Sequence, residues 1–321
     1  MKFSIITPVY NSFSKMNAYF QSLENQTYKN FELILIDDCS TDNSYEELLN
    51  YKQRTSNIDI KLVQNEKNTG PGLARNVGLD YVAGDYITFI DSDDYIEKKC
   101  LENIYKIVRH NNIDCLIFDF IQVINGAQRN ASSIPSFNEG FIDQREAISV
   151  STGSTCCKVY KTDIILSNEL EFPNLMRFED MVFNKLALTK CNKIYYMKKP
   201  LYFYVNNEES IVNDKKNNHE KFVINAFEIL ENTIDEEYIN ELESIFVREL
   251  LYSSVLTMVS RGEKNHIIKK HIKKWEKRYP NWTKNDNIKY FSSHQKLALK
   301  FIQYKFMTGL RLLSYLRDRV K

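Results

Sequence analysis

Three carboxylates stand within four residues, directly after a segment that is typical of a buried strand. The segment covers residues 86–90, and the carboxylates are Asp91, Asp93 and Asp94. β-Branched and aromatic residues favour the strand, and alternation along it directs Asp91 and Asp93 to the same side. Clustered carboxylates repel one another unless a cation or hydrogen-bond donors compensate their charge. Hard oxygen ligands at this density suit Mg²⁺ or Mn²⁺, and those ions in turn suit a diphosphate.

The elements that must position these carboxylates alternate between strand and helix. The sequence predicts strands at 2–9, 31–36, 58–63 and 86–90, and helices at about 12–26, 40–51, 73–82 and 97–111. Such alternation is typical of βαβ units, so we expect an α/β fold with a mainly parallel sheet flanked by helices. Open α/β sheets bind ligands outside the carboxyl ends of their strands, which is where the carboxylates stand.

The pattern changes along the second half of the chain. A strand at 114–123, a long surface loop at 125–140, a helix at 179–188 and an extended segment at 193–204 are predicted. Beyond about residue 213, helical periodicity dominates at 219–234, 236–261, 265–278 and 294–320. We therefore expect two domains: a catalytic domain at 1–213 and an α-helical region at 214–321 that serves a membrane surface, an acceptor or oligomerisation.

Bulk composition excludes several classes of protein. The chain of 321 residues is 43% hydrophobic, as in globular proteins, and its formal charge of +1 gives no reason to expect nucleic-acid binding. No segment has the length and apolarity of a membrane-spanning helix, and the N-terminus lacks the features of a signal peptide. The six cysteines form no Cys-x-x-Cys pair. We therefore expect a cytoplasmic protein with reduced cysteines.

Four motifs occur in order, each at a predicted strand end or loop. They are Ile-Ile-Thr-Pro-Val-Tyr-Asn at 5–11, the segment 31–42 with its Asp-Asp pair, Asn-Thr-Gly-Pro-Gly-Leu-Ala-Arg-Asn at 68–76, and Asp-Ser-Asp-Asp at 91–94. In order and spacing they resemble the family 2 glycosyltransferases, which have the GT-A fold and an inverting mechanism. The resemblance is close over about residues 1–120 and weaker to about 213. It implies bacterial surface polysaccharide synthesis.

The resemblance implies a nucleotide site at the ends of the first two strands. Asp38 matches the carboxylate that accepts a hydrogen bond from the N3–H of uracil, so a UDP-sugar is the expected donor. A carboxylate at this position disfavours other bases by leaving polar groups unpaired. The loop expected to cradle base and ribose contains Thr7, Pro8, Tyr10 and Asn11.

The resemblance places the diphosphate near the third and fourth motifs. Gly70 and Gly72 allow close backbone approach before a helix N-terminus that favours anions, and Arg75 is expected to face the nucleotide. The Asp-x-Asp pair is expected to contact ribose and a Mn²⁺ or Mg²⁺ ion. The nucleotide-binding and metal-binding candidates at this turn are Asp91, Ser92, Asp93 and Asp94.

Simpler interpretations of the same residues remain open. Thr7 and Pro8 could only end a strand, Asp38 could only cap a helix, and Arg75 could lie on a helix surface. The carboxylates at 91–94 could form a capping turn, although three exceed what one cap requires.

Catalysis by inversion requires one further group, a base for the acceptor hydroxyl. Glu179 and Asp180 match the family's Glu-Asp motif at the start of a helix, which implies that Asp180 is the base and that Glu179 orients it or holds the acceptor. Alternatively, both acids only favour the helix N-terminus. Segment 202–211 resembles a later family segment near the diphosphate, with Ser210 as a candidate, but it lacks the usual basic residues.

The charge of the chain is unevenly placed at its C-terminal end. Residues 296–321 contain seven basic residues and one acid, and apolar residues recur at helical spacing: Leu299, Ile302, Phe306, Leu310, Leu313 and Val320. This pattern fits a basic amphipathic helix on the cytoplasmic face of a membrane, close to a lipid-linked acceptor. It fits equally a helix whose apolar stripe packs on the protein. The helical region as a whole could instead serve a partner subunit, and a homo-oligomer stays open.

Two other functions compete with a metal-dependent glycosyltransferase. A nucleotidyltransferase would show a glycine-rich basic loop after the first strand, and residues 7–11 are not one. A non-catalytic nucleotide-binding assembly subunit would bind nucleotide without turnover. A dinucleotide-binding dehydrogenase is disfavoured because no Gly-x-Gly-x-x-Gly follows any predicted strand.

Overall fold

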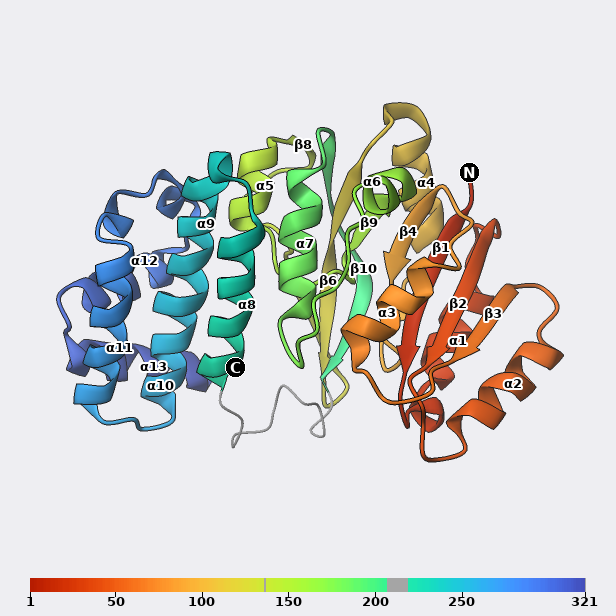
Figure 1. The fold of residues 1–321 in the computed structure, drawn as a ribbon, viewed down its shortest axis with the longest axis horizontal. Coiled ribbons are helices and arrows are strands. Elements are labelled where there is room, and N and C mark those ends of the chain that lie inside the picture. Colours follow the sequence, from red (N-terminus) through yellow and green to blue (C-terminus); the bar gives the residue numbers. More distant parts are fainter. Residues whose placement is uncertain (136, 207–218, 321) are drawn as a thin grey trace. The chain divides into compact units, whose positions relative to one another are not determined.

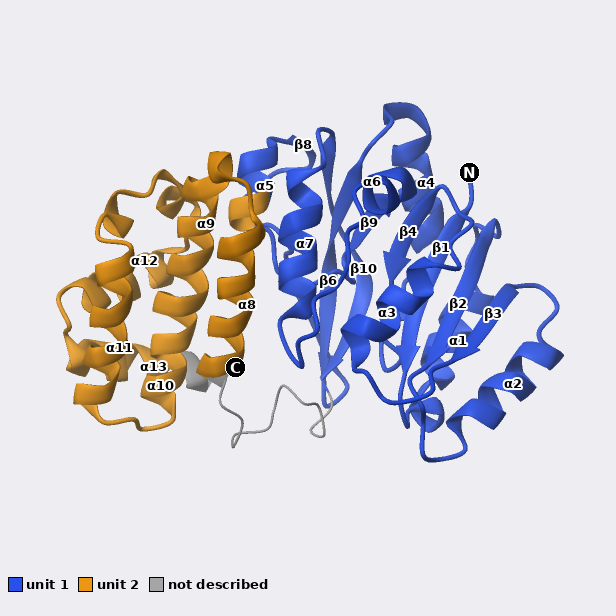
Figure 2. Cartoon of the chain, viewed as in Figure 1, with its two compact units in different colours: residues 1–147, 151–216 blue, residues 148–150, 217–321 orange. Residues whose placement is uncertain are grey.

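The computed structural model describes residues 1–135, 137–206 and 219–320, with the backbone alone for 219 and 317–320. The chain divides into two compact units, coloured separately in Figure 2: Met1–Ala147 with Ser151–Lys216, and Ile148–Val150 with Asn217–Lys321. The domain boundary predicted at residue 213 and the candidate Ser210 lie outside the described residues.

A mixed, mainly parallel sheet with helices on both faces forms the first unit (Figure 1). Its strands are β1 (Phe3–Val9), β2 (Phe31–Asp37), β3 (Asp59–Gln64), β4 (Tyr86–Phe89), β5 (Tyr95–Ile96), β6 (Cys115–Ile124), β7 (Ala127–Ala131), β8 (Gly140–Ile142), β9 (Lys158–Lys161) and β10 (Ile194–Asn206). They follow the order β3-β2-β1-β4-β9-β6-β10-β5, with β7 on β6 and β8 on β10. This architecture confirms the predicted α/β class.

Helices connect these strands along the chain. They are η1 (Phe13–Lys15), α1 (Asn17–Glu24), α2 (Ser44–Arg54), α3 (Pro71–Leu79), α4 (Cys100–Asn111), α5 (Gln144–Val150), α6 (Thr162–Ser167) and α7 (Glu179–Thr189). Strands β1, β2, β3 and β4 are mutually parallel, so the loops after β1, β2 and β4 meet at one edge of the sheet. These loops carry the predicted nucleotide-binding residues.

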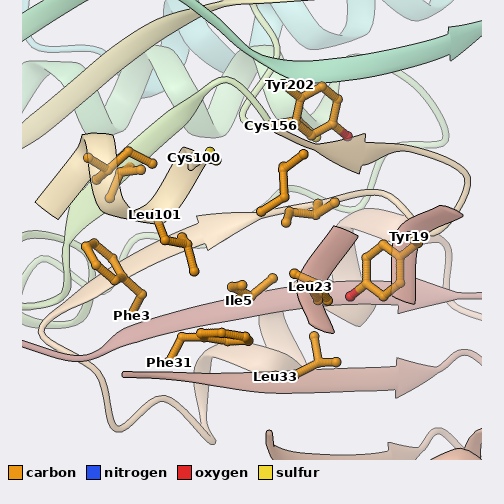
Figure 3. Packing of buried hydrophobic residues seen from close by; sticks show 14 of the residues in the cluster. Phe3, Ile5, Tyr19, Leu23, Phe31, Leu33, Cys100, Leu101, Cys156 and Tyr202 are labelled. Carbon is orange, nitrogen blue, oxygen red and sulfur yellow. The ribbon is translucent and has the colours of Figure 1, made fainter. Parts of the chain in front are cut away.

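Alternating apolar side chains pack the sheet on both faces. On one face, Ile5 and Leu33 belong to a buried cluster that includes Leu23 of α1 (Figure 3). On the other face, a Cβ at Gly78 of α3 would lie 2.5 Å from Ile6, so α3 approaches β1 closely. This packing holds the C-terminal end of α3 against β1.

Helices make up the described part of the second unit. They are α8 (His219–Thr233), η3 (Glu236–Tyr238), α9 (Ile239–Phe246), the π-helical η4 (Val247–Ser253), α10 (Ser254–Ser260), α11 (Asn265–Arg278), η5 (Trp282–Lys284), η6 (Asp286–Tyr290), α12 (Ser293–Gln303) and α13 (Met307–Val320). Their core is aromatic, and the rings of Phe246 and Tyr279 stack with centroids 4.4 Å apart. Among the described residues, no helix has both the length and the apolarity to cross a membrane.

Two predicted elements differ from the structure. The loop predicted at 125–140 contains β7, because Asn125 and Gly126 both have positive φ and close a two-residue hairpin between β6 and β7. Strand β8 begins at its last residue, Gly140. The helix predicted at 294–320 is broken into α12 and α13, where Lys305 adopts the left-handed conformation with φ 51°.

Candidate active site

Asn11 joins the loop after β1 to the loop after β2. Its Oδ1 accepts hydrogen bonds from the backbone N–H groups of Thr41 at 2.8 Å and Asp42 at 3.3 Å, and its own N–H donates to Ser40 Oγ at 3.0 Å. The neighbouring Tyr10 is 45% exposed, so its ring can stack on a planar group. The two loops therefore form one wall of the site.

The side chain of Thr7 does not face this wall. It is fully buried, and its Oγ1 lies 2.6 Å from the hydroxyl of Tyr19 in α1. Alternation along β1 turns this side chain into the core, so any contribution of Thr7 to the predicted nucleotide loop is made by its backbone. Pro8 is partly buried at the next position of the same strand.

Asp38 fastens the loop that leads into α3. Its carboxylate accepts hydrogen bonds from Asn65 Nδ2 at 2.8 Å, from Thr69 Oγ1 at 2.9 Å, and from the backbone N–H groups of Thr69 at 3.0 Å and Gly70 at 2.7 Å. Gly70 is the N-cap of α3 and has a φ of 86°, which favours glycine. These donors fill the acceptor capacity of Asp38, so a bond to uracil would replace one of them.

Arg75 lies at the centre of the site, between two carboxylates. One terminal nitrogen lies 2.7 Å from Asp91 Oδ1 and the other lies 3.2 Å from Glu179 Oε1. The guanidinium is buried, with its carbon 5.3 Å from the centroid of the Phe172 ring. Arg75 thus bridges the Asp-x-Asp turn and the Glu-Asp motif, although Glu179 stands 104 residues away in sequence. That Arg75 also faces the nucleotide stays a prediction.

The Asp-Ser-Asp-Asp turn is tied to both sides of the site. Ser92 Oγ lies 2.9 Å from Ser12 Oγ in the loop after β1. Asp94 is buried, and its oxygens accept hydrogen bonds from the Tyr202 hydroxyl at 2.5 Å and the Val205 N–H at 2.7 Å. Burial and the nearby acids raise the pKa of Asp94 well above its ordinary value.

These contacts correct the prediction that Asp94 is a metal ligand, because its carboxylate points into the protein and binds strand β10. Asp91 and Asp93 are partly exposed at the turn. Within residues 1–135, 137–206 and 219–320, no group of three or more His, Cys, Asp or Glu side chains is arranged to hold a metal ion. Two carboxylates still fit an ion that takes its other ligands from water and a diphosphate, as Mg²⁺ commonly does.

The Glu-Asp motif opens α7 beside Arg75. Phe178, with a φ of 66°, turns the chain into the helix, and Glu179 follows as the first helical residue. Burial and the charge of Glu179 raise the pKa of Asp180 to about 7, against the opposing effects of Arg75 and the Met181 N–H. A carboxylate with this pKa is suited to accept a proton near neutral pH.

Gly72 provides the space that Glu179 occupies. A Cβ at this position would lie 2.8 Å from Glu179 Cγ and 3.3 Å from Phe172 Cβ. We expect Gly72→Ala to displace Glu179 and to lower the transfer rate by roughly 10- to 100-fold, since small misplacements in a site are costly. Steady-state kinetics would measure the loss.

The control for this prediction is Gly78→Ala on the same helix. Its Cβ would meet Ile6 in the core, so we expect a lower melting temperature with an unchanged rate per folded molecule. A Gly72→Ala variant with the wild-type rate would contradict the assigned role of Glu179.

Two buried lysines beside α7 were missed in the sequence. Lys158 of β9 donates to the carbonyls of Thr152 at 3.0 Å and Ser154 at 2.5 Å, and Lys185 of α7 donates to the Ser151 carbonyl at 2.8 Å. Burial lowers the pKa of Lys158. Together they hold the loop before β9 against α7. The position of Lys158, directly after Cys157 and within an apolar strand, is the signal in the sequence that could have indicated a buried structural role.

The chain is similar in sequence to known proteins. A family model described as glycosyl transferase family 2 matches residues 4–166. The poly(ribitol-phosphate) beta-N-acetylglucosaminyltransferase TarS of Staphylococcus aureus is 28% identical over 77% of the chain and 44% of its own length. A poly(ribitol-phosphate) beta-glucosyltransferase of Bacillus spizizenii is 32% identical over 64% of the chain and 32% of its own length. The chain thus spans less than half the length of these relatives.

Solved structures share the fold. The crystal structure of S. aureus TarS 1-349 in complex with UDP has a TM-score of 0.69 and 23% identity, and the match covers 100% of this chain and 92% of that one. A mannosyltransferase from Pyrobaculum calidifontis in complex with GDP-Man and Mn²⁺ has a TM-score of 0.58 and 11% identity over 98% of this chain and 86% of that one.

Proposed function

Because the chain belongs to glycosyl transferase family 2, we propose that it is an inverting glycosyltransferase that moves a sugar from a UDP-sugar to a saccharide or lipid-linked saccharide acceptor. The observation that carries this proposal is the bridge of Arg75 between Asp91 and Glu179. It joins the turn suited to a nucleotide diphosphate to the motif suited to an acceptor hydroxyl. The proposed location is the cytoplasm.

The proposed reaction is a single displacement at the anomeric carbon of the sugar. The acceptor hydroxyl oxygen forms a bond to that carbon while the bond to the diphosphate oxygen breaks, and UDP leaves with the electron pair. Asp180 takes the proton of the hydroxyl, which its pKa of about 7 permits in a large fraction of molecules near neutral pH. Glu179, whose carboxylate is paired with Arg75, orients Asp180.

A divalent cation completes the proposal on the nucleotide side. Asp93, with Asp91, would hold Mn²⁺ or Mg²⁺, and the bound ion would neutralise the charge that develops on the departing diphosphate. Asp91 is already paired with Arg75 through Oδ1, so Asp93 carries the larger share of the metal contact in this proposal. Gly70 precedes the N-terminus of α3, which favours an anion such as a phosphate, while its own N–H donates to Asp38.

The nature of donor and acceptor is supported by the relatives. TarS is described as acting on poly(ribitol-phosphate), and it has been solved in complex with UDP-GlcNAc. The relative from B. spizizenii is described as a glucosyltransferase on the same polymer. We therefore propose a UDP-hexose or UDP-N-acetylhexosamine donor and an acceptor in bacterial surface polysaccharide synthesis.

Nucleotide selectivity tests this proposal. We expect UDP with Mn²⁺ to raise the melting temperature more than GDP, CDP or TDP do, and more than UDP with a chelator does. A ligand at about 100 times its dissociation constant stabilises the folded state by roughly 2.7 kcal/mol, which a melting curve detects.

Turnover completes the same test. Incubation with UDP-GlcNAc, UDP-glucose and saccharide acceptors should release UDP. No melting shift with any nucleotide would overturn the proposal, whereas a shift without UDP release from any donor would indicate a non-catalytic nucleotide-binding subunit.

A further inference from the structure

Helix α11 presents a continuous face of lysines. Segment 264–278 holds seven basic residues against one acid, Glu276. Ile268, Ile272 and Trp275 are buried in the unit's core, so the opposite side of the helix is fixed toward solvent. The lysines on that side are all exposed: Lys269, Lys270, Lys273, Lys274 and Lys277.

Large apolar side chains are exposed on α12, α13 and the turn between them. The stripe predicted from the sequence is mostly inside the unit, since Leu299, Ile302, Leu310 and Leu313 are buried. The side chain of Val320 lies outside the described part of the structure. A different set of residues is 50–76% exposed: Tyr304, Phe306, Leu312, Tyr315 and Leu316.

Backbone geometry keeps this apolar set in place. Lys305 in the left-handed conformation turns the chain sharply between the two helices. Gly309 lets the rings of Phe301 and Phe306 lie against α13, because a Cβ there would come within 2.5 Å of Phe306. Phe306 therefore packs against Gly309 while half of its surface stays exposed.

Two contacts join the lysine face to the apolar side chains. Lys305 forms an ion pair with Glu276 near the end of α11, with 2.8 Å between Nζ and the carboxylate oxygen. Arg311 of α13 donates to the Glu263 carbonyl at 2.9 Å and to Asn265 Oδ1 at 2.8 Å at the start of α11. The single acid of α11 is thus paired. The turn before α13 contacts the end of α11, and α13 itself contacts its start; Figure 1 shows where these helices lie in the fold.

We propose that the exposed lysines of α11 and the exposed apolar residues 304–316, here called the basic–apolar surface, dock the protein on an anionic lipid membrane. Lysines attract anionic headgroups, while leucine and aromatic side chains enter the boundary between headgroups and acyl chains. Contiguous apolar side chains beside a basic face mark a membrane or partner contact. A soluble polyanion would be bound by the lysines without any use for the exposed leucines, so the combination favours lipid.

This inference concerns where the protein acts and does not depend on the sugar that it transfers. It also changes the surface predicted from the sequence, since the lysines of α11 replace the buried stripe of 299–313 as the main contact. The contact would hold the site near acceptors that are anchored in lipid.

Vesicle co-sedimentation of the full chain tests the proposal. We expect binding to vesicles of phosphatidylcholine with phosphatidylglycerol, weak binding to phosphatidylcholine alone, and loss of binding at high salt. The triple variant Lys269→Gln/Lys273→Gln/Lys277→Gln should bind the mixed vesicles roughly 100-fold more weakly, at about fivefold for each lysine. Leu312→Ser/Leu316→Ser should weaken binding at least about 10-fold, because both side chains are exposed and would enter the lipid.

A matched control removes three exposed lysines from the first unit: Lys52→Gln/Lys98→Gln/Lys193→Gln. It should bind like wild type. A wild-type melting temperature and circular dichroism spectrum for every variant would verify that the helices of the second unit are intact. Wild-type vesicle binding by the α11 variant would overturn the proposal. So would a leucine variant that binds the vesicles normally, because the surface would then recognise charge alone, as a soluble polyanion site does.

Discussion

Asp180→Asn is expected to lower the rate of sugar transfer by about 10³-fold while UDP binds as tightly as before. An amide cannot accept the proton of the acceptor hydroxyl, and general base catalysis of this kind contributes roughly 10²- to 10⁴-fold. The substitution preserves the volume of the side chain at the start of α7. Transfer rates at saturating donor and acceptor, together with calorimetric titration of UDP, would measure the two effects.

Asp163→Asn is the matched control for this variant. Asp163 is an exposed acid in the first turn of α6, so the change should leave both the rate and the UDP affinity unaltered. If Asp180→Asn retained the wild-type rate, the base would be another group. If Asp180→Asn lost UDP binding as well, the proposal that nucleotide binding and acceptor activation depend on different residues would be contradicted.

Asp93→Ala should abolish the dependence of UDP binding on Mn²⁺ and reduce transfer by a similar factor of about 10² to 10³. The reason is that Asp91 already carries the Arg75 contact and Asp94 is turned toward β10. Removing Asp93 would leave a diphosphate beside uncompensated negative charge. Titration of UDP with Mn²⁺ and with a chelator would measure the effect.

Asp80→Ala provides the comparison, since Asp80 is an exposed acid just after α3. It should bind UDP with the wild-type response to Mn²⁺. An Asp93→Ala variant whose UDP binding still responds normally to Mn²⁺ would show that another residue holds the metal.

The sequence was most informative where candidate functional residues stand at the ends of predicted strands. Apolar alternation located β1, β2 and β4, and parallel pairing then brought the loops after them to one edge. The predicted placement of Asp38, Asp91 and Asp93 near that edge followed from period and order alone. The hydrogen-bond and ion-pair partners of these carboxylates could not be predicted in this way.

Side-chain direction depended on contacts that no local pattern contains. Asp94 is turned inward by Tyr202, which is 108 residues away in sequence. Arg75 is held by Glu179, which is 104 residues away. The period of a helix or strand predicts which of its residues share a face, but not which residues from distant parts of the sequence will contact that face.

In two places a pattern that extends over many residues concealed a local feature of the backbone. Polar residues at 125–140 favoured a loop, although Asn125 and Gly126 are a typical hairpin turn. Helical periodicity across 294–320 concealed the break at Lys305, because the residues on either side keep helical spacing in two separate helices.

The pH dependence of kcat/KM tests the central assignment of Asp180 most directly. The base must be ionised to accept a proton, and burial together with Glu179 raises its pKa to about 7. The account predicts that kcat/KM rises with pH through about 7 and then levels off. Glu179→Gln should move this rise to lower pH, because it removes the neighbouring negative charge that raises the pKa. A rate that is flat across this range, or a rise that Glu179→Gln leaves in place or moves to higher pH, would contradict the assignment of Asp180 as the base.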